Sequence, residues 1–145
     1  MNSGEKAVEY FDSGFNCCQS TLASLCQKLK LDNDSAFKIA AAFGGGICRS
    51  GETCGAVTGA LMLIGLKHGM VSADDLEAKE RAYVIANQFI EEFKRRNNSI
   101  KCKELLNCDL STPEGAAYAK ENKIQKSICP KFLRDAVAIV VEIIE

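Results

Sequence analysis

Apolar residues recur at helical spacing along nearly the whole chain, and no segment alternates apolar and polar residues as a half-buried strand does. Within residues 16–31 the apolar positions Cys18, Leu22, Leu25 and Leu29 follow at i, i+4, i+7 and i+11. Residues 132–144 are apolar on nearly every side, which predicts a central helix. A chain with this pattern buries its apolar residues by packing helices together. We therefore expect an all-α fold, a compact bundle of six or seven helices.

Capping residues, glycines and prolines place the ends of these helices. Gly14 and Gly69 are stop signals, Ser72 and Asp75 have capping-box spacing, and proline follows Thr112. The expected helices cover residues 3–12, 16–31, 53–68 and 72–97, one from Asp32 or Asp34 to the glycine triplet, one from Thr112-Pro113, and one from Cys129-Pro130. Residues 98–111 are expected to be a loop, with at most a short turn of helix.

Size and composition bound the function. The 145 residues, 47% apolar and 26% charged, predict one globular domain over residues 1–145. The net charge of −1 is spread evenly, which argues against nucleic-acid binding. The longest apolar run, residues 56–66, is far short of the roughly 20 residues that span a bilayer. The first residues lack a signal-peptide pattern, so we expect a cytoplasmic protein.

The stretch GGGICRSGETCGAVTG, residues 44–59, is unusually rich in glycine for a helical chain. No Lys-Ser/Thr pair follows its glycines, so it is not a phosphate-binding P-loop. Gly51, Gly55 and Gly59 recur at i+4 and predict a bare helix face that another backbone can approach closely. Gly44–Gly46 supply permissive turn geometry.

The chain contains eight cysteines, an unusually high number for its length, and four of them lie at expected helix starts. These are Cys17 after Asn16, Cys54 after Thr53, Cys102 three residues after Ser99, and Cys129 before Pro130. Backbone N–H groups and the helix dipole stabilise a thiolate at such positions, so we expect thiols of low pKa that act as redox centres, nucleophiles or metal ligands. No C-x-x-C occurs, which removes the signal for a thioredoxin motif, a zinc knuckle or covalent haem.

The other four cysteines have simpler interpretations. Cys18 and Cys26 lie on or beside an apolar stripe and are expected to be buried. Cys48 and Cys108 lie in expected loops, six residues from Cys54 and Cys102, and could resolve a disulfide, add a ligand or do nothing.

Several motifs together resemble a known family. NCxQ at residues 16–19, FGGG-x-x-R-x-G-x-x-CGAxxGA at 43–60, KCxxLL at 101–106 and a lone cysteine before the final helix occur in that order. The chain resembles the small redox-active proteins defined by a CGAxxG motif and four characteristic cysteines, the C_GCAxxG_C_C family. The resemblance implies that Cys17, Cys54, Cys102 and Cys129 are the functional set.

Three functions follow as hypotheses. The first is a redox protein whose four cysteines converge and bind an iron–sulfur cluster or another metal. The second is a metal-free thiol/disulfide protein that uses the same cysteines. The third is a structural or interaction domain with buried cysteines or a fixed zinc site. Gly55, Gly59, Cys48 and Cys108 are candidate accessory residues at a cofactor. The partner would be a redox protein or a small electron carrier, and a homodimer could form through an apolar face of the last helix.

Overall fold

The computed structural model describes residues 1–144, and these residues form an all-helical structure. Its elements are α1 (Ser3–Ser13), α2 (Cys17–Leu25), a 3₁₀ helix η1 (Cys26–Leu29), α3 (Asn33–Ile39), α4 (Gly55–His68), α5 (Leu76–Asn97), α6 (Cys102–Leu106), α7 (Pro113–Glu121) and α8 (Ile124–Ile144). The all-α prediction is confirmed. The expected count of six or seven helices is too low, because the described chain has eight α-helices and the additional one, α6, lies in the expected loop.

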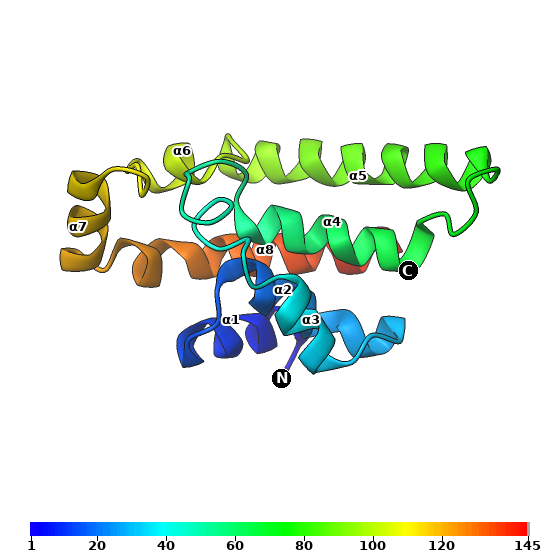
Figure 1. Cartoon of the computed structure of the whole chain (residues 1–145), viewed down its shortest axis with the longest axis horizontal. Helices are drawn as coiled ribbons and strands as arrows, with labels where there is room; N and C mark the ends of the chain where they lie inside the picture. The colour runs from blue at the N-terminus through cyan, green and yellow to red at the C-terminus, as the bar shows by residue number, and fades with distance from the viewer. Residues whose placement is uncertain (145) are drawn as a thin grey trace.

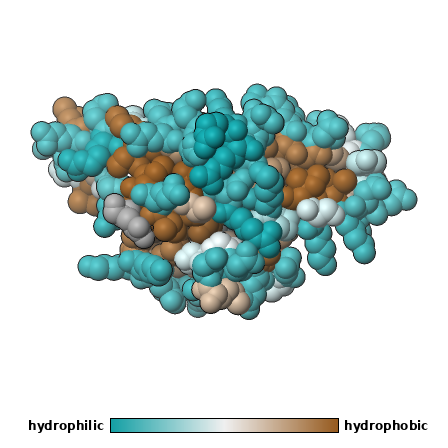
Figure 2. Space-filling view, turned by 180° about the vertical axis from the view of Figure 1, so that it is seen from behind, coloured by the Kyte–Doolittle hydropathy of each residue, from teal (hydrophilic) through white to brown (hydrophobic). Residues whose placement is uncertain are grey.

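The three longest helices define the shape (Figure 1). α4, α5 and α8 run along the long axis, α1, α2 and α3 lie together on one side, and α7 crosses one end. On the face turned away in that view, hydrophobic residues form separate areas among hydrophilic ones (Figure 2). Within residues 1–144 no helix has the length and apolar character that a membrane span needs.

The core lies between α1, α2, α4, α5 and α8. Its largest fully buried side chains include Leu22, Leu63, Phe89, Phe93 and Leu133. The predicted central position of the last helix is therefore confirmed. Most of its apolar residues pack inside the chain, while Val141, Ile143 and Ile144 are only partly buried, and the homodimer stays a prediction.

The last helix begins earlier than we predicted. α8 starts at Ile124 and continues through Pro130, whose ring removes one backbone donor from the helix. Cys129 therefore lies inside α8 and not at its start. Packing along the rest of this apolar helix outweighs the local cost of the proline.

Two further boundaries differ from their predicted positions. The predicted helix 16–31 ends at Leu25 and continues as η1. α5 begins at Leu76 and not at Ser72, because the carboxylate of Asp75 caps it by accepting from the backbone N–H of Ala78 at 3.1 Å.

The predicted bare glycine face holds α2 against α4. A Cβ added at Gly59 would lie 2.9 Å from the carbonyl oxygen of Cys18, and one at Gly55 would lie 2.8 Å from the backbone nitrogen of the same residue. Gly51 does not belong to this face, since it precedes the helix and adopts a φ of 76°. The face therefore consists of Gly55 and Gly59, and it fixes the start of α4 beside the start of α2.

A candidate four-cysteine site

Asn16 positions the first cysteine. Its side chain accepts from the backbone N–H of Gln19 at 2.8 Å, and the Gln19 side chain accepts from the Asn16 N–H at 3.0 Å. This capping box starts α2 at Cys17. The Asn16 amide also donates to the carbonyl oxygen of Ala41 at 3.0 Å, which ties the start of α2 to the loop after α3.

That loop makes a left-handed turn. Gly45 and Gly46 and the three residues after them all have φ between 52° and 70°. At Gly46 the missing side chain is also required by space, because a Cβ there would lie 2.6 Å from the Cβ of Cys102. The turn thus brings its backbone directly against the third cysteine of the site.

A short antiparallel bridge joins the starts of α4 and α6. Thr53 pairs with Lys101, the only β-bridge within the described chain. The N–H of Cys54 donates to the carbonyl of Ile100 at 2.7 Å, and the N–H of Cys102 donates to the carbonyl of Glu52 at 2.6 Å. Two cysteines far apart in the sequence are held next to each other by these two hydrogen bonds.

Four cysteines line one small cavity. Cys17, Cys54, Cys102 and Cys129 come from α2, the N-cap of α4, α6 and α8, and each is 4–7% exposed. The other lining residues are Gly45, Gly46, Gly55, Leu105, Leu106, Gln125 and Phe132. The cavity has a volume of about 10 Å³, close to that of one water molecule. Its potential ligands are thiols and one amide, without a carboxylate or an imidazole.

Burial makes these thiols weak acids. The neighbouring Cys129 thiol and burial together raise the pKa of Cys17 well above its usual range. Burial and the nearby Cys17 raise the pKa of Cys102 to about 12 and also raise that of Cys54.

The expectation of low pKa values is therefore wrong for Cys17, Cys54 and Cys102. Backbone N–H groups of Ala56 and Val57 do lower the pKa of Cys54, but desolvation is the larger effect. Without a bound cation, these three thiols are protonated at neutral pH.

The remaining cysteines lie outside the cavity. Cys18 and Cys26 are fully buried as predicted; Cys18 lies 3.8 Å from the Met62 sulfur, and Cys26 donates to the Asn33 side chain. Cys48 is exposed on the left-handed turn. Cys108 donates to the carbonyl of Gly115 at 3.1 Å, although it is near enough to Cys102 to raise that residue's pKa.

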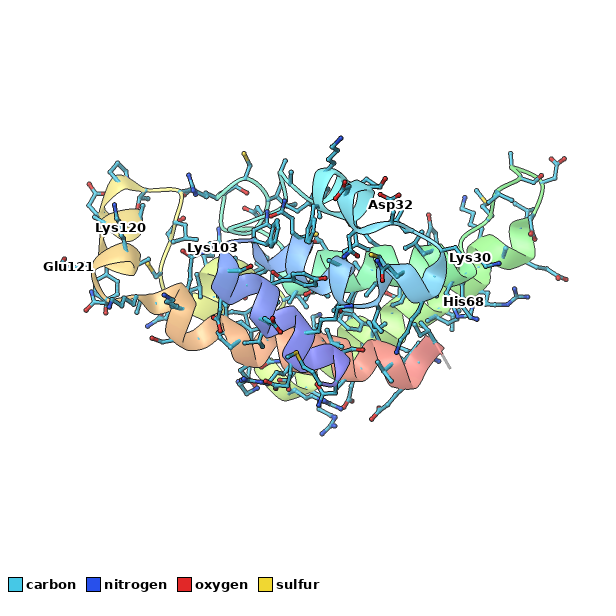
Figure 3. The ribbon with its side chains drawn as sticks, turned by 90° about the horizontal axis from the view of Figure 1, so that it is seen from below. Lys30, Asp32, His68, Lys103, Lys120 and Glu121 are labelled. Atoms are coloured by element: carbon cyan, nitrogen blue, oxygen red, sulfur yellow. The ribbon has the colours of Figure 1, made fainter. Side chains whose placement is uncertain are left out.

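Of the predicted accessory residues, only Gly55 lines the cavity. Gly59 lies one turn further along α4 against Cys18 and Thr21. The only histidine, His68, ends α4 at the opposite end of the molecule from Lys120 (Figure 3).

Sequence reasoning did not identify Gln125 or Phe132 as part of the site. Both belong to α8, and the expected start at Cys129-Pro130 left Gln125 outside the last helix. The apolar residues that precede the proline, Ile124 and Ile128, are the only local signal that the helix begins earlier.

The sequence model of one protein family, described as "Putative redox-active protein (C_GCAxxG_C_C)", matches residues 15–143. The chain belongs to this family. The match covers all four cavity cysteines and the CGAVTG segment at residues 54–59. For this C_GCAxxG_C_C protein no curated protein and no solved structure gives a match.

The residues of the C_GCAxxG_C_C motif have identifiable structural roles in this protein. Its two CGAVTG glycines are the residues that let α4 approach α2, and its cysteines are the residues that line the cavity. In the ligand-free arrangement of residues 1–144, no three Cys, His, Asp or Glu side chains are positioned to hold a single metal ion.

Proposed function

We propose that this protein is a redox protein that binds an iron–sulfur cluster through Cys17, Cys54, Cys102 and Cys129. The observation that carries the proposal is the convergence of four thiols from four separate elements on one cavity. Cysteine thiolates are the usual ligands of such clusters, four for each. When bound, a cluster would accept and release single electrons.

Four cysteine thiols are a suitable ligand set for a cluster, but the cavity has to become larger to hold one. Its volume of about 10 Å³ is too small for iron and sulfide together, so the cavity has to widen when a cluster binds. Gly46 and Gly55 place bare backbone in its wall.

The raised pKa values favour a metal over free thiolate chemistry. A coordinated thiol loses its proton to the metal's charge, whatever its pKa in the free protein. Cluster assembly should therefore release protons and proceed faster at alkaline pH. The backbone N–H groups of Ala56 and Val57 that face the Cys54 sulfur would then stabilise its negative charge.

A second candidate function is thiol/disulfide exchange between Cys17 and Cys129, two neighbouring thiols of the cavity. The two thiols would form one S–S bond and pass two electrons and two protons to a partner disulfide, which becomes two thiols. Two observations count against it. The sulfurs are no more than 7% exposed, and a protonated thiol is a poor nucleophile.

Reduced cysteines persist in a reducing compartment, and for that reason we also propose the cytoplasm as the protein's location.

The test is purification without oxygen, followed by visible spectroscopy and by analysis of iron and acid-labile sulfide. We expect a coloured protein with stoichiometric iron, lost in Cys54→Ser and kept in Cys26→Ser, a matched change at a buried cysteine outside the cavity. A colourless protein that takes up no iron after anaerobic reconstitution would overturn the proposal. A reversible Cys17–Cys129 disulfide in that sample would support the second candidate.

A further inference from the structure

Two residues of the cavity wall, Gln125 and Gly45, also line grooves on the surface. Gln125 lines the cavity and also two surface grooves. The first groove, of about 450 Å³, lies between the end of α1, α7 and the start of α8. The second, of about 290 Å³, lies between Asn16 and the left-handed turn that carries Arg49. We call these two grooves the Gln125 grooves, because Gln125 lines both of them and the cysteine cavity.

The Gln125 grooves are lined by positive charge alone. Their charged residues are Lys120, Lys123, Lys126 and Arg49, and neither groove contains an acidic residue. Within residues 1–144, no carboxylate oxygen comes within 4.0 Å of any of these four side-chain nitrogens. Both grooves are therefore regions of uncompensated positive charge in a chain whose net charge is −1.

The other basic cluster of the chain differs in this respect. On α5, Glu92 forms ion pairs with both Arg95 and Arg96, which neutralise each other's fields at short range. At the Gln125 grooves the first turn of α8 adds to the positive potential, because its backbone N–H groups have no helical acceptor. The Gln125 grooves thus differ from the α5 cluster because they contain no acidic residue that compensates their positive charge.

The arrangement of these cations suits a broad partner more than a small ion. Lys120 belongs to α7, Lys123 and Lys126 to the start of α8, and Arg49 to a separate loop. They surround two shallow grooves and do not converge on one point. Electron-transfer complexes are small and transient, and they form quickly when opposite charges steer the partners together.

We propose that the Gln125 grooves form the docking surface for an acidic electron-transfer protein. This inference rests on the proposed redox function. One electron passes between the partner's redox centre and the four-cysteine site across Gln125; one centre is oxidised, the other is reduced, and no bond is made or broken. The basic residues orient the partner so that its centre lies over Gln125.

The kinetic test uses two small oxidants of opposite charge, ferricyanide and hexaammineruthenium(III), with anaerobically reduced protein. In Lys120→Glu/Lys126→Glu, oxidation by ferricyanide at low salt should slow by roughly tenfold, and oxidation by the ruthenium complex should accelerate. Both effects should vanish at high salt. The control Lys67→Glu/Lys94→Glu makes the same change in net charge at exposed sites outside these grooves. Equal effects of the two double variants would overturn the proposal.

A binding test separates this surface from the redox proposal. Poly-L-glutamate titrated into reduced protein should shift backbone amide NMR signals at residues 120–126 and at Arg49, and this needs no cluster. Shifts spread over all exposed lysines, or stronger binding of an oligothymidylate at equal charge concentration, would overturn the acidic-protein docking surface. A protein that carries no reducible centre but shows the localised shifts keeps the docking surface and loses the proposed redox function.

Discussion

The side-chain amide of Asn16 donates to the carbonyl oxygen of Ala41 at 3.0 Å, so one residue caps α2 and also holds the loop after α3. Gly44 packs against the same asparagine, where an added Cβ would lie 2.6 Å from the Asn16 Cβ. The NC and FGGG motifs are therefore two halves of one contact. This contact between Asn16 and the loop fixes the position of Cys17 relative to the turn that packs against Cys102.

Replacing Asn16 tests this double role. Asn16→Ala removes a capping box and the bonds to the loop, and we expect a loss of about 2 kcal/mol in the free energy of unfolding. Asn2 caps α1 with a similar backbone conformation but without long-range bonds, so Asn2→Ala should cost about 1 kcal/mol. Urea unfolding measures both values. Equal losses would mean that the contact with the loop adds no stability.

The contact between α2 and α4 can be tested with a pair of glycines on α4. A Cβ at Gly59 would lie 2.9 Å from the Cβ of Thr21, so Gly59→Ala should destabilise the protein by about 1–3 kcal/mol. Gly65 has no neighbour within 4 Å of an added Cβ, and Gly65→Ala should stabilise it by roughly 0.5–1 kcal/mol. Thermal unfolding distinguishes the two. Stabilisation by both substitutions would show that the helices are not in close contact.

The left-handed turn makes a prediction about the site. Gly46→Ala introduces a Cβ 2.6 Å from that of Cys102 and should reduce iron uptake as well as stability. Gly14 also has a positive φ, 122°, but nothing lies within 4 Å of its added Cβ. Gly14→Ala should therefore cost only backbone strain, about 1 kcal/mol, with iron uptake unchanged. Iron analysis of both reconstituted variants is the measurement, and unimpaired uptake by Gly46→Ala would count against the tight contact.

The buried thiols predict a stability that falls at alkaline pH. Burial raises the pKa of Cys18 from 9.0 to about 11, so between these values the folded chain keeps a proton that the unfolded chain releases. Its contribution is complete below pH 9 and declines by about 1.4 kcal/mol per pH unit as the pH rises towards 11.

We therefore expect Cys18→Ala to show a shallower decline than the unsubstituted protein when urea unfolding of the metal-free, reduced forms is compared across this range. Lysine and tyrosine titration is common to both proteins and cancels in the comparison. Parallel curves would contradict the raised pKa of Cys18.

Local signals were sufficient for much of the fold. Asp32 and Gly69 bound their helices as expected, because capping is decided by a few neighbouring residues. The start of α8 was predicted too late, because proline is common at the first position of a helix. Only packing along the whole of α8 keeps Pro130 in the helix interior. α6 is five residues long, too short to produce a periodic pattern.

The sequence analysis grouped the four cysteines that line the cavity, but it did not predict their pKa values. Helix starts and the family resemblance selected the cysteines that line the cavity. The sign of the pKa shift at Cys54 was wrong, since a dipole can be inferred from sequence whereas desolvation depends on what the folded chain places around the sulfur. Gln125 carries no local signal of its own.

The four cavity cysteines stand at positions 17, 54, 102 and 129, so the wall of the cavity is drawn from nearly the full length of the chain. Closing such long loops is slow, and the thiols come together only when the last helix docks on the first ones. During synthesis the early cysteines are exposed with no partners, open to oxidation or to scavenging of metal. The complete set of four thiols therefore forms only in a fully folded chain. If α8 is missing or not docked, the cavity lacks the thiol of Cys129.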